Sequence, residues 1–103
     1  MNVIYRGSTP THAFSIPVTA AELKAVRVTY RQSDGLIIEK TKGDCTFEDG
    51  YLYVKLTQEE TYKLDAALPA EVQLKLQFTD DDVEPSQIIR CTVIDSLNQE
   101  VLP

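Results

Sequence analysis

The chain has 103 residues, which is close to the commonest size of a single folded domain. Its 43% hydrophobic and 25% charged residues are typical of a folded protein and argue against extended disorder. Sixteen acidic and ten basic residues give a net charge of -6, which disfavours nucleic acid as the main partner because phosphate binding needs clustered Lys and Arg. We therefore expect one domain over residues 1–103.

The first part of the chain predicts a weak strand followed by a turn. Val3 to Arg6 is a short extended segment, and "RGSTPT" from Arg6 to Thr11 contains the Gly and Pro of a turn. A polar, Thr-rich stretch can also add to the sheet edge of another chain. We keep Arg6, Thr9 and Thr11 as candidate interface residues on this ground.

A core strand is expected from His12 to Ile16, with Phe14 and Ile16 pointing inward. Thr19 and Glu22 then form a T-x-x-E pattern, the signature of a capped helix start. The pattern predicts a short helical turn before the next strand.

The following segments alternate apolar and polar side chains with the period of two that a half-buried strand needs. The expected inward positions are Val26, Val28, Tyr30, Leu52, Val54, Leu56, Val72, Leu74, Leu76, Phe78, Ile89, Cys91 and Val93, while Ile88 and Ile94 fall on the polar side. Asp34-Gly35 and Asp49-Gly50 each lie between two such segments, and Asp-Gly there is a strong hairpin signal because tight hairpin turns need positive φ.

The stretch "YVKLTQEETYKL" changes from strand to helix within a few residues. Thr57 and Glu60 form a second T-x-x-E pattern, which predicts a capping box at the start of a helix. The helix must end before Pro69, so we expect one or two turns that carry the chain between sheets. Tyr62 and Leu64 are expected to fill the end of the core.

Two cysteines, Cys45 and Cys91, are far apart in the sequence and form no C-x-x-C pair. We interpret them as small buried apolar residues. A disulfide between them is the alternative, although a cytosolic protein would normally keep both thiols reduced.

Together, about seven short strands with turn signals roughly every ten residues predict an all-β fold. The first choice is an antiparallel Greek-key β-sandwich of immunoglobulin-like outline, with one or two short helical crossover turns. A small barrel is the second choice.

Nothing in the sequence predicts catalysis or a cofactor. The one histidine, His12, lies in an expected strand, and no serine occupies a G-x-S-x-G elbow. Asp80 to Asp82 with Glu84 are dense enough to suggest Ca²⁺ but lack the spacing and central Gly of an EF-hand loop, so a solvated loop is the simpler interpretation. We expect no enzyme, no metal and no cofactor.

Tyr51 and Tyr53 should lie on the outer face of their strand. Exposed tyrosines favour protein interfaces because they bury a large area at a small entropic cost. We therefore add both to the candidate interface residues. Covering the sheet surface is the alternative role.

Four segments, "YRGSTPTHAFSIP", "VRVTYRQSDGLIIEK", "VKLTQEETYKL" and "SQIIRCTVID", occur in this order. Together they resemble a family of small proteins encoded by tailed phages and prophages of Gram-positive gut bacteria. They also resemble, more loosely, the N-terminal β-sandwich domain of phage baseplate upper proteins. The resemblance covers nearly the whole chain and implies a structural or tail-associated protein with no catalytic residues. It departs at "QFTDDDVEPSQII", where the family's hairpin carries a Gly.

These observations lead to a functional expectation. The chain would be a non-enzymatic assembly and protein-interaction module that contacts copies of itself, as a homo-oligomer, or other virion proteins. A carbohydrate-binding or adhesion module and a host-modulating phage protein are the alternatives. No run approaches the roughly 20 apolar residues of a membrane span, and the start lacks the pattern of a signal peptide. We therefore expect the protein in the virion or in the host-cell cytoplasm, without a membrane partner.

Overall fold

A computed structural model describes residues 3–33, 35, 37–86, 88–97 and 101–102. Within these residues the strands are β1 (Val3–Tyr5), β2 (Thr11–Ser15), β3 (Leu23–Arg31), β4 (Ile37–Thr41), β5 (Cys45–Glu48), β6 (Tyr51–Lys55), β7 (Ala70–Phe78), β8 (Val83–Pro85) and β9 (Ile89–Ile94). The helical elements are short: 3₁₀ turns at Ala20–Glu22 and Lys42–Asp44, and the α-helix α1 (Gln58–Tyr62). The expectation of an all-β protein with short helical turns is confirmed.

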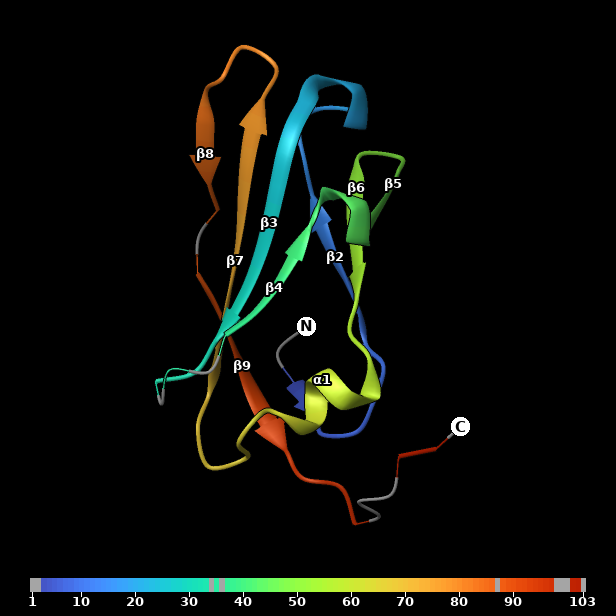
Figure 1. Ribbon diagram of the computed structural model, residues 1–103, viewed down its shortest axis with the longest axis vertical. Helices are drawn as coiled ribbons and strands as arrows, with labels where there is room; N and C mark the ends of the chain where they lie inside the picture. The colour runs from blue at the N-terminus through green and yellow to red at the C-terminus, as the bar shows by residue number, and fades with distance from the viewer. Residues whose placement is uncertain (1–2, 34, 36, 87, 98–100, 103) are drawn as a thin grey trace.

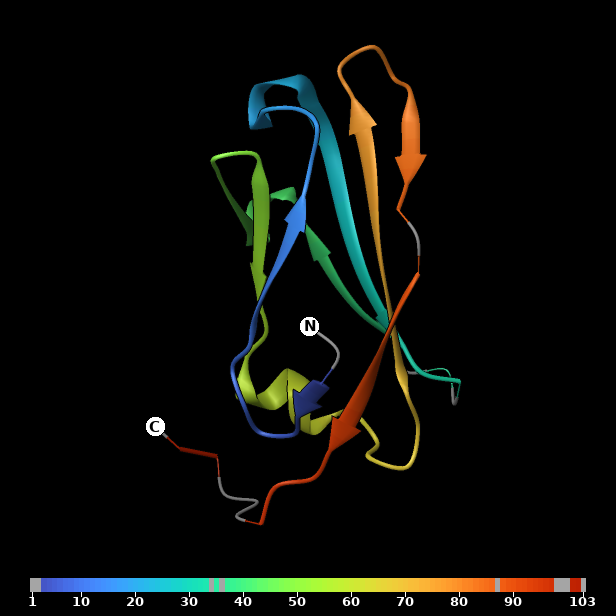
Figure 2. The ribbon, with the colours of Figure 1, turned by 180° about the vertical axis from the view of Figure 1, so that it is seen from behind.

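The strands fall into two sheets (Figure 1). The large sheet has the order β1-β9-β7-β3-β4, with β8 also pairing β7, and the small sheet has the order β2-β6-β5. Seen from behind, the small sheet lies against one face of the large sheet (Figure 2). The prediction of a purely antiparallel arrangement is wrong at one place, because β1 pairs β9 in parallel. These two strands are far apart in the chain, so no hairpin turn dictates their relative direction.

One hydrophobic core fills the space between the sheets. The predicted inward side chains are buried, except that Phe78 and Ile89 are only half-buried at its margin. Ile88 and Ile94 are exposed, as the alternation predicts. Each fully buried Val, Leu or Ile stabilises the fold by roughly 1.5–3 kcal/mol relative to exposure.

The two Asp-Gly dipeptides of the sequence fall between strands that pair with each other. Asp49 and Gly50 have φ of 51° and 80° and join β5 to β6, with Glu48 opposite Tyr51. Two positive φ values in a two-residue loop define a type I′ turn, which matches the twist of the flanking strands. The hairpin of β3 and β4 also forms, although Asp34 lies outside the described residues.

The capping box at the start of α1 is confirmed. The Glu60 amide donates to Thr57 Oγ1 at 3.2 Å, and the Thr57 amide donates to Glu60 Oε1 at 2.8 Å. At the earlier T-x-x-E pattern the turn forms, but the Thr19 side chain does not cap it. This 3₁₀ turn lasts only three residues, and its Glu22 amide donates instead to the Thr19 carbonyl.

The acidic segment includes a strand that the sequence did not predict. Residues 80–82 form the expected loop, in which Asp81 has a φ of 71°. After the loop, β8 pairs one end of β7, and β9 pairs the other end. Pro85 is tolerated in β8 because an edge strand need not donate every hydrogen bond.

The end of the core is closed as predicted by Leu64, which is buried, whereas Tyr62 is only half-buried. Cys91 is buried and Cys45 is half-buried, and they do not form a disulfide with each other. The interpretation of the two cysteines as buried residues is therefore confirmed for Cys91 and in part for Cys45.

Candidate functional site

The candidate interface residues divide into two groups in space. Arg6 lies at the α1 end of the molecule, where its Nε donates to the Leu64 carbonyl at 2.8 Å and its Nη2 to the Tyr62 carbonyl at 3.0 Å. Its Nη1 forms an ion pair with Asp95 at 2.6 Å. Arg6 therefore ties the end of β1 to the exit of α1 and the end of β9. Thr9 is exposed in the loop before β2.

Tyr51, Tyr53 and Thr11 lie together on the outer face of the small sheet. Tyr51 is 44% exposed, Tyr53 is half-buried, and their ring centroids are 6.2 Å apart. In the register of β2 and β6, Ser15 lies opposite Tyr51 and Ala13 opposite Tyr53. The tyrosines therefore form a ridge beside β2, whose outward side chains are all small. We call this surface the tyrosine face; its outward residues are Thr11, Ala13, Ser15, Thr46, Glu48, Tyr51, Tyr53 and Lys55.

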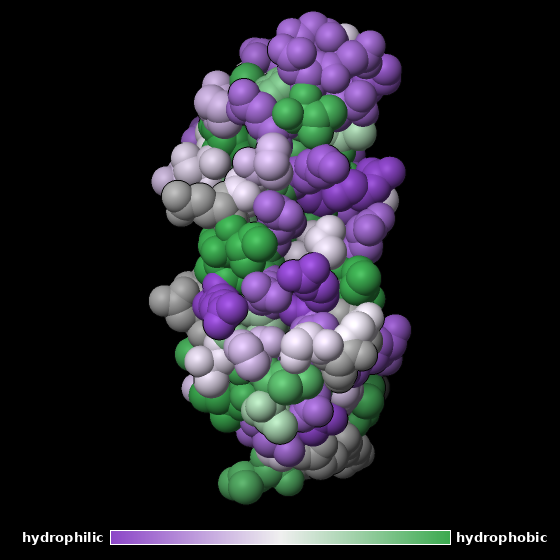
Figure 3. Space-filling model, turned by 90° about the vertical axis from the view of Figure 1, so that its left-hand side faces the viewer, coloured by the Kyte–Doolittle hydropathy of each residue, from purple (hydrophilic) through white to green (hydrophobic). Residues whose placement is uncertain are grey.

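The outer face of the large sheet has a different character. Glu71 there forms ion pairs with Arg31 at 3.1 Å and with Arg90 at 3.9 Å, and Arg27 forms one with Glu39 at 3.4 Å. On the side of the molecule seen in Figure 3, hydrophobic side chains occur in separate patches between hydrophilic ones. Such a mixed surface is typical of a solvated sheet face.

His12 belongs to the core. Its side chain is buried and its Nδ1 lies 2.6 Å from the Tyr30 hydroxyl, across the two sheets. Burial lowers the pKa of His12 and raises the pKa of Tyr30. A substrate would not reach the imidazole unless the sheets moved apart, so the geometry gives this pair a packing role.

The acidic loop holds a surface ion pair. Lys24 Nζ lies 2.6 Å from Asp81 Oδ1, and Asp80 Oδ1 accepts from the Asp82 amide at 3.0 Å. In the part of the chain that the structure describes, no three His, Cys, Asp or Glu side chains form a group that could hold a metal ion. The described helices are also too short to cross a membrane.

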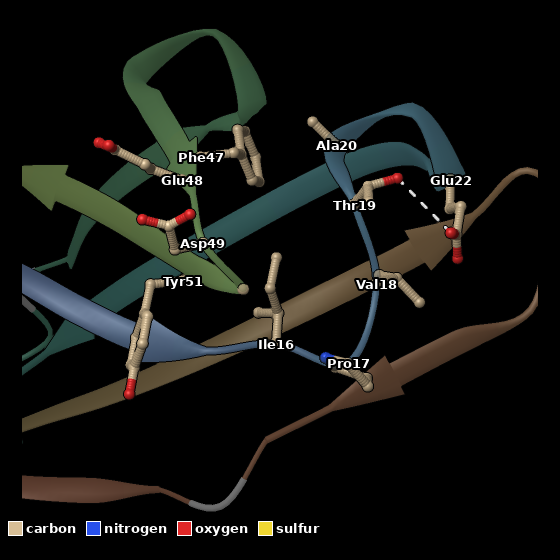
Figure 4. Close-up of a pocket in the computed structure, with 11 residues that line it drawn as sticks. Ile16, Pro17, Val18, Thr19, Ala20, Glu22, Phe47, Glu48, Asp49 and Tyr51 are labelled. Atoms are coloured by element: carbon tan, nitrogen blue, oxygen red, sulfur yellow. Dashed lines mark hydrogen bonds between the residues drawn. The ribbon is translucent and has the colours of Figure 1, made fainter.

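A groove lies beside the tyrosine face, at the end of the molecule opposite α1. We call it the end groove; it separates residues 16–22 from the tip of the β5–β6 hairpin, residues 47–51, and has a volume of about 380 Å³. Ile16 and Phe47 point into the space between the two segments (Figure 4). Tyr51 borders both the groove and the tyrosine face.

No pattern in the sequence indicated the end groove. Its two walls are about 30 residues apart in the chain, and only their approach in space creates the cavity. Glu22 was predicted only as part of a helix-capping pattern, and no role was predicted for Glu48. A pattern of neighbouring residues cannot predict that two distant segments lie close together in space.

Comparisons of the chain with protein-family models, with curated proteins and with solved structures gave no match. The function is therefore argued from the geometry and from the sequence resemblance.

Proposed function

We propose that the chain is a non-enzymatic structural or tail-associated protein of a phage or prophage, and that it works as an assembly and protein-interaction module. The resemblance of four segments to phage proteins supports the origin. The observation that carries the interaction role is the tyrosine face, where two aromatic rings lie side by side on an open sheet surface.

We also propose that the fold is an immunoglobulin-like Greek-key sandwich. The strand order supports this. If β2 to β7 and β9 are lettered B, C, C′, D, E, F and G, the small sheet reads B-E-D and the large sheet contains G-F-C-C′. Immunoglobulin-like sandwiches divide these strands between their sheets in the same way. Loops gather at the two ends of such a sandwich, which leaves the sheet faces free for contacts.

The partner proposed for the tyrosine face is a second copy of the chain. A twofold axis through the face would set the Tyr51–Tyr53 ridge of each copy against the small side chains of β2 in the other. Ala13 and Ser15 leave room for the rings, so the face is complementary to itself. An isologous dimer requires this self-complementarity.

The dimer should be weak on its own. Three strands are about 14 Å wide, and five residues are about 17 Å long. The contact is therefore smaller than the roughly 800 Å² per partner of a stable interface. In a particle, many copies held at high local concentration would compensate for the weak pair contact.

Light scattering on a size-exclusion column, run as a concentration series, tests the proposal. The mass should rise with concentration toward a dimer, and Tyr51→Ser with Tyr53→Ser should abolish the rise. Tyr5→Ser is the matched control, because Tyr5 is 54% exposed on β1, away from the tyrosine face. A wild-type monomer at every concentration, or equal loss in the control, would reject the self-contact. A wild-type monomer would favour a different protein as partner.

A further inference from the structure

The end groove has a floor of apolar side chains. Ile16 is buried at its base, and Val18 and Phe47 pack against the core while remaining partly accessible. A volume of about 380 Å³ lies at the lower end of the range of small-molecule pockets, roughly 300–1,000 Å³. The floor therefore offers space for one apolar side chain.

The rim of the groove carries negative charge. Glu22, Glu48 and Asp49 line it, and none of the described residues that line it is a Lys or Arg. Among the described residues, none of these three carboxylates forms an ion pair, whereas Asp81 and Glu71 elsewhere on the surface do. The Glu22 carboxylate accepts from the Thr19 hydroxyl at 3.5 Å, as Figure 4 shows, and keeps its negative charge. With Glu48 and Asp49 on the other wall, it gives the groove a negative rim that attracts a cationic partner.

Hydrogen bonds hold the two walls of the groove in place. The Ile16 amide donates to the Gly50 carbonyl at 2.9 Å, which joins the segment of residues 16–22 to the tip of the β5–β6 hairpin. The Thr79 amide donates to the Glu22 carbonyl at 3.1 Å, which holds the other end of this segment. A preformed groove loses little conformational entropy on binding.

We propose that the end groove binds a protein segment in which an apolar side chain is flanked by Lys or Arg. The apolar side chain would occupy the floor over Ile16 and Phe47, and the flanking cations would meet Glu48 and Asp49 at the rim. This site goes beyond the proposed self-contact, because its apolar floor over Ile16 and Phe47 lies outside the tyrosine face, and only Glu48 and Tyr51 belong to both surfaces.

The probe is the peptide acetyl-Gly-Lys-Leu-Lys-Gly-amide, titrated into ¹⁵N-labelled full-length chain at low salt. Amide shifts should change at residues 16–22 and 47–51 and saturate. Two comparison peptides separate the contributions: Gly in place of Leu removes the anchor, and Glu in place of both Lys reverses the charge. Both should bind at least about fivefold more weakly.

Charge-removing variants test the rim. Glu48→Gln with Asp49→Asn should weaken peptide binding about fivefold, as expected for two exposed ion pairs. Asn is well tolerated at positive φ, so the type I′ turn at Asp49 stays intact. Glu59→Gln is the control; it removes one charge from α1, at the far end of the molecule, and should leave the affinity unchanged.

Three results would overturn the proposal: no saturable shift with the Lys-Leu-Lys peptide, equal binding of the charge-reversed peptide, or an unchanged affinity in the rim variant. Shifts at the groove with chitotriose but not with the peptide would also overturn it, and would support the carbohydrate-binding alternative. The Lys-Leu-Lys titration is also carried out on the Tyr53→Ser chain, where it should give the same affinity. Peptide binding and the self-contact measured by light scattering are thereby tested independently.

Discussion

The imidazole of His12 and the phenol of Tyr30 meet inside the molecule, with 2.6 Å between Nδ1 and the hydroxyl oxygen. His12 comes from the small sheet and Tyr30 from the large sheet, so this hydrogen bond joins the two layers. Both side chains are buried. The only histidine of the chain is therefore a titratable group placed between the sheets.

The first prediction concerns pH. Because burial lowers the folded-state pKa of His12 below its ordinary 6.5, the unfolded chain binds a proton more readily than the folded chain. The free energy of unfolding should therefore fall as the pH drops through 6.5 toward the lowered pKa, by at most about 1.4 kcal/mol per pH unit. Urea unfolding at closely spaced pH values above and below 6.5 measures it.

A non-titrating variant provides the control. His12→Gln keeps a hydrogen-bonding group near Tyr30 but cannot take up a proton. Its unfolding free energy should be nearly flat where the wild type declines, because unfolded carboxylates titrate near pH 4. The burial argument fails if the two curves have the same slope.

The second prediction concerns Gly7, which has a φ of 79° and lies against the Tyr62 ring. A Cβ there would sit 2.4 Å from the ring carbon Cζ. Gly7→Ala should lower the free energy of unfolding by about 2–4 kcal/mol, through backbone strain and the displaced ring. Chemical denaturation measures the loss.

Gly35→Ala is the matched control for Gly7. Gly35 also has a positive φ, 95°, but nothing lies within 4 Å of its Cβ position. This variant carries only the backbone term, about 1–2 kcal/mol. Equal losses of stability at the two glycines would contradict the prediction, because they would show that displacing the Tyr62 ring does not destabilise the fold.

The third prediction separates the hydrogen bonds of Arg6 from its ion pair. Arg6→Lys removes the planar guanidinium that donates to two carbonyls, and should lower the free energy of unfolding by about 1.5–3 kcal/mol. Asp95→Asn removes the charge from the partly exposed ion pair but keeps an oxygen that can accept from the Ser96 amide, and should cost less than about 1 kcal/mol. If Asp95→Asn were the more damaging change in thermal unfolding, the carbonyl contacts would not be the main contribution.

The fourth prediction concerns Gln32, whose side chain is buried. Its Nε2 donates to the carbonyls of Asp65 and Leu68 at 2.8 and 3.0 Å, and its Oε1 accepts from the Asp65 amide at 2.8 Å. Gln32→Leu leaves three backbone groups without these bonds and should cost about 2–4 kcal/mol in urea unfolding. Gln73→Leu, which loses one bond to Ser86, should cost about 1 kcal/mol or less. Similar costs would contradict the prediction.

The elements that could be predicted from sequence are those set by neighbouring residues. Period-two alternation identified the buried side of β3, β6 and β7 because one face of each strand lies on the core. Asp49-Gly50 predicted its hairpin since positive φ at both residues is a local requirement. The Thr57 and Glu60 capping box was found for the same reason.

What could not be predicted depends on contacts between distant segments. Alternation tells which side of a strand is buried but not which strand lies beside it, so the parallel partner of β1 stayed hidden. Gln32 was missed because a polar residue at the end of a strand is usually exposed, and only the later approach of Asp65 and Leu68 satisfies its amide. The end groove was missed for the same reason.

The pairing of β1 with β9 has a consequence for the order in which the chain matures. Val3 lies opposite Thr92 and Tyr5 opposite Ile94, and the Arg6 amide donates to the Ile94 carbonyl at 2.8 Å. During synthesis β1 leaves the ribosome long before β9, and it must wait for β9 before its neighbour in the sheet is present. The small sheet, made of strands closer in sequence, is free to form earlier. Although β1 is made before the other strands of this fold, it is thus among the last of them to be paired.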